Sequence, residues 1–172
     1  NRSAAFFDVE GTLVSATIVH YFCFIRSRML PRVVRPFWQA LFWVKCLYYL
    51  ALDHRSRAEF NVAFYRSYRG LSGVRVRALA KLCFDQVVQK NLYPAAIPLI
   101  NEHRTAGRPI VLITGSLDFI AAEVARALQA DHLVAAELME CDGCFTGELK
   151  GPALSGGVKV ASIRNYAAKE GV

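Results

Sequence analysis

The chain has 172 residues, of which 54% are hydrophobic, and it carries a formal net charge of +7. This length fits one domain with room for an insert, and the apolar content suffices for a packed core, which excludes an intrinsically disordered protein. Neither a run of 18 uncharged apolar residues nor a secretory signal is visible, so we expect a protein of the cytoplasm or the membrane periphery that is not secreted.

The apolar patterns predict β-strands and α-helices in alternation, with a helical insert near the start. The expected elements, in chain order, are a buried strand over residues 4–8, helices over 16–28, 37–52, 56–68 and 72–90 (the last with Ser72 as N-cap), a helix over 94–106, a strand over 109–114, a helix over 117–128, a hairpin made of 133–138 and 145–149, and a helix over 159–168. This order predicts an α/β fold, a doubly wound, Rossmann-like parallel sheet with an inserted all-helical cap and a β-hairpin.

The charge follows the same division of the chain. Residues 16–91 contain 13 Lys and Arg against three Asp and Glu, a local charge of +10, whereas the remainder has 8 against 11. We therefore expect a core domain formed by residues 1–15 and 92–172 and a basic helical cap domain formed by 16–91. A basic segment can attract phosphates, nucleic acid or an anionic membrane, but no nucleic-acid module is visible, so we expect no nucleic-acid partner.

The aromatic segment Phe37–Leu52 admits two interpretations. It can be a cap helix that packs against its neighbours, or a helix that lies on a membrane surface, with Arg28, Arg32 and Arg35 facing anionic headgroups. The sequence leaves both open.

The five cysteines argue against a secreted disulfide scaffold, because they are odd in number and scattered. Cys141 and Cys144 have C-x-x-C spacing, but a zinc site needs two further ligands and we find no second pair. Asp142-Gly143 between them is a hairpin-turn signal, so we expect the two thiols to be cross-strand neighbours.

Polar residues that can carry chemistry follow the two predicted core strands. Asp8 and Glu10 are two residues apart at the end of the first strand, where one carboxylate can attack phosphorus and the other can move a proton. Such a pair also attracts Mg²⁺. At the second strand end, Thr114-Gly115-Ser116 offers hydroxyl and backbone N–H groups to phosphate oxygens, although Ser116 can equally be a helix N-cap. Lys159 could neutralise developing negative charge, or it is an ordinary lysine of a first helical turn.

Three ordered motifs resemble those of the haloacid dehalogenase (HAD) superfamily of phosphatases, in its phosphoserine-phosphatase-like branch with a helical cap (subfamily IB). They are residues 6–14 (FFDVEGTLV), residues 111–116 (VLITGS) and residues 156–159 (GGVK). The resemblance implies that Asp8 forms an aspartyl-phosphate, that Glu10 is the general acid/base, and that Lys159 stabilises the charge of the intermediate. It further implies Mg²⁺ as cofactor, held by Asp8 and Glu10, and a set of phosphate-binding residues, namely Gly11, Thr12, Thr114, Gly115 and Ser116.

The chain departs from that family pattern in three places. Glu10 stands where most relatives have Asp, although the related enolase-phosphatases also carry Glu there. Thr17 stands where phosphoserine phosphatases have the glutamate that reads the substrate amine, so we do not expect phosphoserine as substrate. The acidic fourth motif that completes the Mg²⁺ site is not found after Lys159, so we expect a C-terminally incomplete core, weak Mg²⁺ binding and impaired turnover in this chain.

These observations predict a Mg²⁺-dependent phosphomonoester hydrolase that acts on a small-molecule phosphate ester, with a hydrophobic or lipid-like substrate favoured by the aromatic cap. The alternative is a HAD-like, non-hydrolytic domain that binds or docks to membranes within a larger protein such as a lipid acyltransferase.

Overall fold

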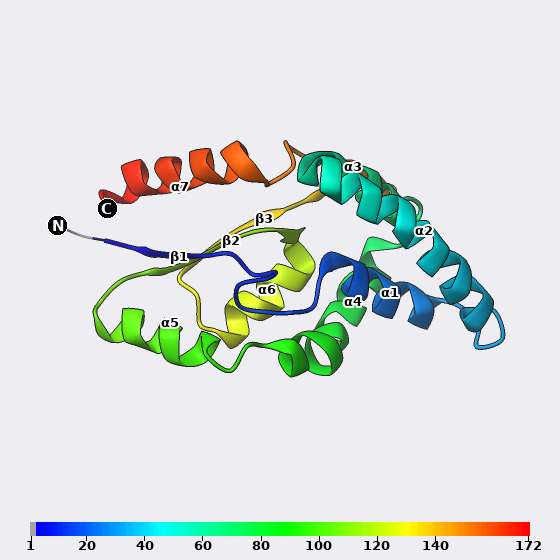
Figure 1. Ribbon diagram of the computed structural model, residues 1–172, viewed down its shortest axis with the longest axis horizontal. Coiled ribbons are helices and arrows are strands. Elements are labelled where there is room, and N and C mark those ends of the chain that lie inside the picture. The colour runs from blue at the N-terminus through cyan, green and yellow to red at the C-terminus, as the bar shows by residue number, and fades with distance from the viewer. Residues whose placement is uncertain (1–2) are drawn as a thin grey trace.

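A three-stranded parallel β-sheet forms the centre of the computed structural model, which describes residues 3–172. The strands lie in the order β1 (Ala5–Phe7), β2 (Ile110–Leu117) and β3 (His132–Ala136). Helix α7 (Gly156–Glu170) covers one face, and α5 (Ala96–Thr105) and α6 (Asp118–Ala127) cover the other (Figure 1). The α/β fold predicted from the sequence is therefore confirmed.

Strand β2 is the most buried part of this sheet. It pairs with β1 through Phe6 and Val111 and with β3 through Val111 and His132. The run Ile110–Ile113 is buried on both faces, as expected of a central parallel strand covered by helices on both sides. The two strand ends that carry polar residues consequently lie at one edge of the sheet.

The regular elements between β1 and α5 are all helices. The elements are α1 (Ile18–Met29), α2 (Arg35–Arg55), α3 (Arg57–Tyr65) with the 3₁₀ turn η1 (Arg66–Tyr68), and α4 (Gly73–Cys83), which continues through the π-helical turn η2 (Phe84–Val88) and the 3₁₀ turn η3 (Gln89–Asn91). The hydroxyl of Ser72 accepts a hydrogen bond from the Arg75 N–H at 3.5 Å, which confirms the predicted N-cap.

Helix α2 presents a wide apolar face to solvent. It is longer at both ends than predicted, and its inner face packs through Phe42 and Tyr49. Its outer face exposes large side chains at helical spacing, among them Phe37, Leu41, Val44 and Tyr48. No helix within residues 3–172 is both long and apolar enough to cross a membrane.

The predicted hairpin is corrected by the structure. Its first arm was expected over residues 133–138, but His132–Ala136 instead forms β3 and joins the parallel sheet. The hairpin consists of β4 (Leu138–Cys141) and β5 (Cys144–Leu149). A short apolar run fits either kind of strand, so its partner could not be deduced from periodicity.

The turn of that hairpin was predicted correctly. Asp142 and Gly143 both have positive φ angles, 49° and 73°, as a tight two-residue hairpin turn requires. Cys141 and Cys144 are directly opposed in the pairing, and no cluster of three metal-ligating side chains exists among the described residues.

The hairpin also binds the helical segment. The Gly73 N–H donates to the Gly143 carbonyl at 2.9 Å, and Phe145 exchanges backbone hydrogen bonds with Gly70 and Leu71 at 2.8 and 2.9 Å. An ion pair between Arg77 of α4 and Glu140 of β4 adds a charged contact.

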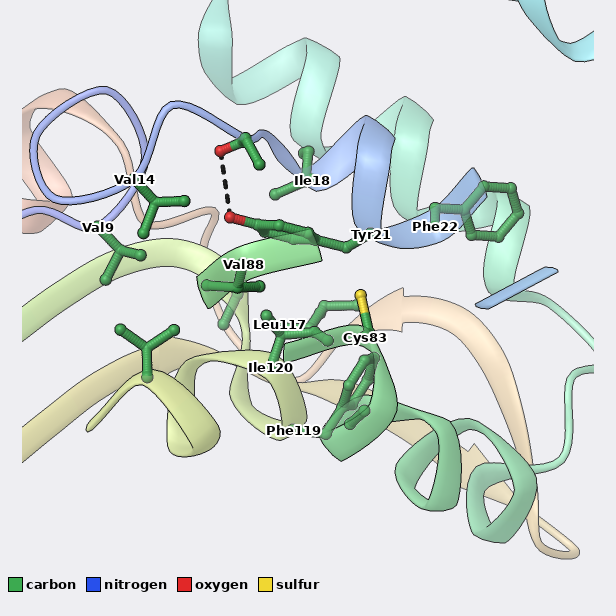
Figure 2. Close-up of a cluster of buried hydrophobic side chains, with 14 of the residues drawn as sticks. Val9, Val14, Ile18, Tyr21, Phe22, Cys83, Val88, Leu117, Phe119 and Ile120 are labelled. Carbon is green, nitrogen blue, oxygen red and sulfur yellow. Dashed lines mark hydrogen bonds between the residues drawn. The ribbon is translucent and has the colours of Figure 1, made fainter. Parts of the chain in front are cut away.

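One hydrophobic core extends through both parts of the chain. Figure 2 shows Val9 and Leu117 from the strand ends in the same cluster as Ile18, Tyr21 and Val88 from the helical segment. The Tyr21 hydroxyl donates to the Ala16 carbonyl at 3.1 Å, so its polar atom is satisfied inside the cluster. The helical segment thus packs against the sheet through a continuous apolar contact.

An aromatic cluster holds α1, α2 and α3 together. Phe64 is fully buried, and its ring lies 5.6 Å from Phe22, 5.2 Å from Tyr49 and 5.5 Å from Phe60, centroid to centroid. Aromatic pairs at these separations add to the free energy gained by burial.

Phe64→Ala is expected to lower the free energy of unfolding by about 3–5 kcal/mol, because it removes a ring from a packed core and leaves a cavity. Urea unfolding followed by circular dichroism measures this change. The matched control is Phe37→Ala on α2, whose side chain is 78% exposed and whose loss should change stability by less than about 0.5 kcal/mol. Equal effects of the two substitutions would contradict the described packing.

Candidate active site

Asp8 lies immediately after β1 and is joined to the first turn of α7. Its Oδ2 accepts a hydrogen bond from the Lys159 Nζ at 2.5 Å, and its Oδ1 accepts one from the Val9 N–H at 2.9 Å. Both side chains of the pair are partly exposed. Lys159 is therefore not merely a first-turn lysine, because its ammonium group is directed at the carboxylate predicted to react.

Glu10 connects the ends of the two central strands. Its Oε2 accepts a hydrogen bond from the Thr114 hydroxyl at 2.7 Å, and its Oε1 accepts one from the Ser116 hydroxyl. Thr114 and Ser116 are themselves buried polar residues. The three side chains form a closed network at the edge of the sheet.

Burial controls the protonation of Glu10. The loss of solvent raises the pKa of this carboxyl above its ordinary value of 4.5, and the hydrogen bonds from Ser116 and Thr114 oppose that effect only in part. The negative charge of Asp8 raises the pKa further. A carboxyl that retains its proton above the usual range is suited to act as a general acid.

A tight turn follows Glu10 and returns the chain to the core. Gly11 has a φ of 78°, a conformation that glycine adopts without strain, and its N–H donates to the Val14 carbonyl at 2.8 Å. Gly11 and Thr12 are exposed and do not line the cavity around Asp8. Their predicted role toward phosphate stays a prediction.

Gly115 is closely confined. A Cβ atom at this position would lie 3.1 Å from the Leu154 carbonyl oxygen and 3.2 Å from the Asn61 side-chain nitrogen, so a larger residue would displace one of them. The Gly115 carbonyl accepts a hydrogen bond from the buried Tyr65 hydroxyl. Contacts with the helical segment thus hold the backbone of Gly115 in place.

Ser116 does not cap the following helix. Strand β2 continues to Leu117, and Leu117 occupies the N-cap position of α6. The Ser116 hydroxyl binds Glu10, and its N–H donates to the Thr114 hydroxyl oxygen at 3.0 Å. The N-cap interpretation of Ser116 is therefore wrong, because the strand is longer than its apolar run predicts. Binding of phosphate by these two hydroxyls stays a prediction.

A cavity of about 350 Å³ opens around Asp8. We call it the Asp8 cavity; it is lined by Asp8, Glu10, Ile18, Arg57, Asn61, Gly115, Leu154, Ser155, Gly156 and Lys159. Two of these residues, Arg57 and Asn61 of α3, are not predicted by the sequence motifs. They lie near the strand ends because the helical segment packs there. No local sequence motif indicates this position.

The residues present can fit Mg²⁺ in part. The Asp8 carboxylate is partly exposed and can offer an oxygen in addition to its hydrogen bonds from Val9 and Lys159, whereas both carboxylate oxygens of Glu10 accept hydrogen bonds from buried hydroxyls. Mg²⁺ is commonly held by one or two carboxylates, with water and substrate phosphate oxygens as the other ligands. This donor set therefore fits a magnesium ion that shares its coordination with water and phosphate.

Comparison with known proteins gives one family and several relatives. Residues 5–172 match the family described as haloacid dehalogenase-like hydrolase. A Mycobacterium tuberculosis protein named as a probable phosphatase is 28% identical over 175 residues, which cover 99% of this chain and 59% of that protein. The chain spans about three fifths of the length of these curated relatives.

Two solved structures share the fold. A Bordetella pertussis Tohama I protein of unknown function has a TM-score of 0.82 at 22% identity, over 100% of this chain and 77% of that one. A phospho-aspartyl intermediate analogue of phosphoserine phosphatase has a TM-score of 0.70 at 18% identity, over 100% of this chain and 74% of that one. The likeness extends across the helical segment as well as the sheet.

Glu10→Gln should stabilise the protein relative to the wild type as the pH rises. Since the pKa of Glu10 is raised in the folded state, the wild type is penalised for ionising this buried group, and it loses stability as the pH increases from about 4.5 through the raised pKa. Glutamine carries no such charge. Urea unfolding at a series of pH values between about 4 and 8 measures the difference in free energy.

The control is Glu102→Gln on α5, which removes one exposed carboxylate. A Glu10→Gln protein whose stability followed that of the wild type at every pH would show that burial of the Glu10 charge has no cost.

Proposed function

Since the chain belongs to the haloacid dehalogenase-like hydrolase family, we propose that it is the catalytic part of a phosphomonoester hydrolase that works through an aspartyl-phosphate. The observation that carries the proposal is the assembly of Asp8, Lys159 and Glu10 at one cavity. A carboxylate nucleophile, a cation and a carboxyl of raised pKa are the groups that phosphate transfer to an aspartate requires.

In the first step a carboxylate oxygen of Asp8 attacks the phosphorus atom. The bond from phosphorus to the ester oxygen breaks, and the proton of Glu10 moves to the departing alkoxide. Lys159 remains beside Asp8 and offsets the negative charge that gathers on the phosphoryl oxygens. The raised pKa of Glu10 supports this role, because the group must hold a proton at the start of the step.

In the second step Glu10, now a carboxylate, takes a proton from water. The resulting hydroxide oxygen attacks phosphorus, the bond from phosphorus to Asp8 breaks, and inorganic phosphate leaves. Both side chains then have their original protonation states. The hydroxyls of Thr114 and Ser116 hold the Glu10 side chain in one orientation through both steps.

We propose Mg²⁺ as the cofactor, bound by the Asp8 carboxylate and the main-chain carbonyl of Glu10. When bound, it supplies positive charge to the phosphate oxygens. The family and the Asp8 carboxylate that lines the cavity support this choice.

Phosphoserine is not the substrate we propose. Binding of its ammonium group requires a carboxylate in addition to the two reacting ones, whereas the acidic residues that line the Asp8 cavity are Asp8 and Glu10. Arg57 lines the same cavity and would repel an ammonium group. Thr17, at the position expected to read the amine, forms a backbone hydrogen bond to the His20 ring nitrogen at 3.2 Å and starts α1.

Asp8→Asn in the full-length protein should lower the hydrolysis of p-nitrophenyl phosphate by at least about a thousandfold, because the nucleophile is removed. Release of p-nitrophenolate measures the rate. The control is Asp142→Asn, in the exposed hairpin turn, which should keep the wild-type rate. Activity of Asp8→Asn near the wild-type rate would overturn the assignment of the nucleophile.

A second candidate function is docking to an anionic membrane surface through α2. The exposed apolar face of this helix carries Phe37, Leu41, Val44 and Tyr48, and basic residues lie at both its ends and within it. An apolar face bordered by Lys and Arg is typical of helices that lie in a membrane interface. This function is compatible with hydrolysis, since the face is separate from the Asp8 cavity.

The protein should sediment with vesicles of phosphatidylcholine that contain phosphatidylglycerol, and less so with phosphatidylcholine alone or at high salt. Phe37→Asp combined with Leu41→Asp should abolish the sedimentation, because charge enters the apolar face. Val74→Asp, at an exposed valine of α4, is the control. Wild-type protein that stays in the supernatant with anionic vesicles would refute this docking.

A further inference from the structure

A second cavity lies beside the Asp8 cavity, between the start of α1 and the middle of α2. We call it the side groove. It has a volume of about 380 Å³, and its walls are mostly apolar. The side chains that form them include Ile18, Val19, Trp43, Leu47, Leu50 and Phe60.

The two cavities meet at Ile18 and Arg57, because these two residues line both. Ile18 is buried and belongs to the core cluster (Figure 2), so it forms a fixed wall. Arg57 is held on the other side, where its Nη1 donates to the carboxylate oxygens of Asp53 at 2.8 and 2.7 Å. Its guanidinium group also lies 5.1 Å from the centre of the Phe60 ring.

The chemistry changes sharply across this junction. On one side are Asp8, Glu10 and Lys159, the groups that can transfer a phosphoryl group. On the other side are aliphatic and aromatic walls, among which Thr17 and His20 are polar and the charged residues Asp53 and Arg57 pair with each other. A molecule that occupies both cavities must therefore carry a phosphate at one end and an apolar chain at the other.

The side groove leaves large apolar side chains exposed to solvent, which is unfavourable when no ligand covers them. Leu47 is 68% and Leu50 is 55% exposed, and large apolar side chains gathered in a hollow are favourable when an apolar ligand covers them. Arg57 stands at the junction, where a guanidinium can bind oxygens next to the phosphorus atom while its alkyl stem contacts the chain.

We propose that the side groove binds the hydrocarbon chain of the substrate, so that the protein acts on phosphate monoesters of long-chain alcohols, which include lipid phosphates. The proposal rests on the proposed phosphatase function, because the phosphate end is placed at Asp8. It differs from membrane docking, since the outer face of α2 can meet a bilayer whatever the substrate is.

The first experiment measures phosphate release from ethyl, butyl, hexyl and octyl phosphate by the full-length protein. The value of kcat/KM should increase about threefold for each methylene that enters the groove. Hydrolysis of all four esters at similar kcat/KM would overturn the groove proposal and leave the phosphatase function in place. Hydrolysis of none would contradict the phosphatase function.

Variants on α2 localise the effect. Leu47→Gln combined with Leu50→Gln should reduce the ratio of kcat/KM for octyl phosphate to that for ethyl phosphate by about tenfold or more. The matched control is Leu99→Gln on α5, a substitution of the same kind at a residue that is 41% exposed and lines neither the Asp8 cavity nor the side groove. This variant should keep the wild-type ratio of the two kcat/KM values. A lower ratio in the control variant alone would show that the hydrocarbon chain of the substrate binds outside the side groove.

A binding measurement decides the proposal without activity. Trp43 lines the groove and is one of two tryptophans in the chain, so octyl phosphate should change the tryptophan fluorescence of the Asp8→Asn protein. Trp43→Phe should remove most of that change. If octyl phosphate bound no more tightly than ethyl phosphate, the side groove would not bind the hydrocarbon chain of the substrate.

Discussion

The partly buried carboxyl of Glu10 is the constraint on which the site depends. A carboxyl removed from water needs hydrogen-bond partners, because an unsatisfied buried polar group is costly. Thr114 and Ser116 supply them from the neighbouring strand, so the end of β1 is fixed relative to the end of β2. Asp8, two residues before Glu10, acquires its position from the same network and meets Lys159 from α7. These polar contacts thus join three segments that are far apart in the sequence.

The helical segment contributes to the site as much as the sheet does. Tyr65 holds the Gly115 carbonyl, Asn61 and Arg57 line the Asp8 cavity, and Ile18 separates it from the side groove. These contacts are possible because the helices share a hydrophobic core with the strand ends. The same segment leaves the outer face of α2 exposed to solvent, and this is the face that the proposed membrane docking would cover.

Most of the fold and half of the site could be predicted from local patterns. Asp8, Glu10 and Lys159 stand at strand ends or at a helix start, where sequence position and spatial position coincide. The assignment of His132–Ala136 to a hairpin failed, because a short apolar strand does not encode its partner. Arg57 and Asn61 could not be found, since their approach to Asp8 depends on how α3 packs across the sheet edge. Such placement arises from contacts of long sequence separation.

The hairpin β4–β5 has a consequence for how molecules reach the site. It binds α4 and the segment before it through backbone hydrogen bonds and through the pair Arg77–Glu140, and the chain itself joins the helical segment to the sheet at its other end. A segment fastened at both ends cannot swing away as a hinged lid without breaking these bonds. For the proposed function, substrate and product would then enter and leave through the openings of the Asp8 cavity and the side groove.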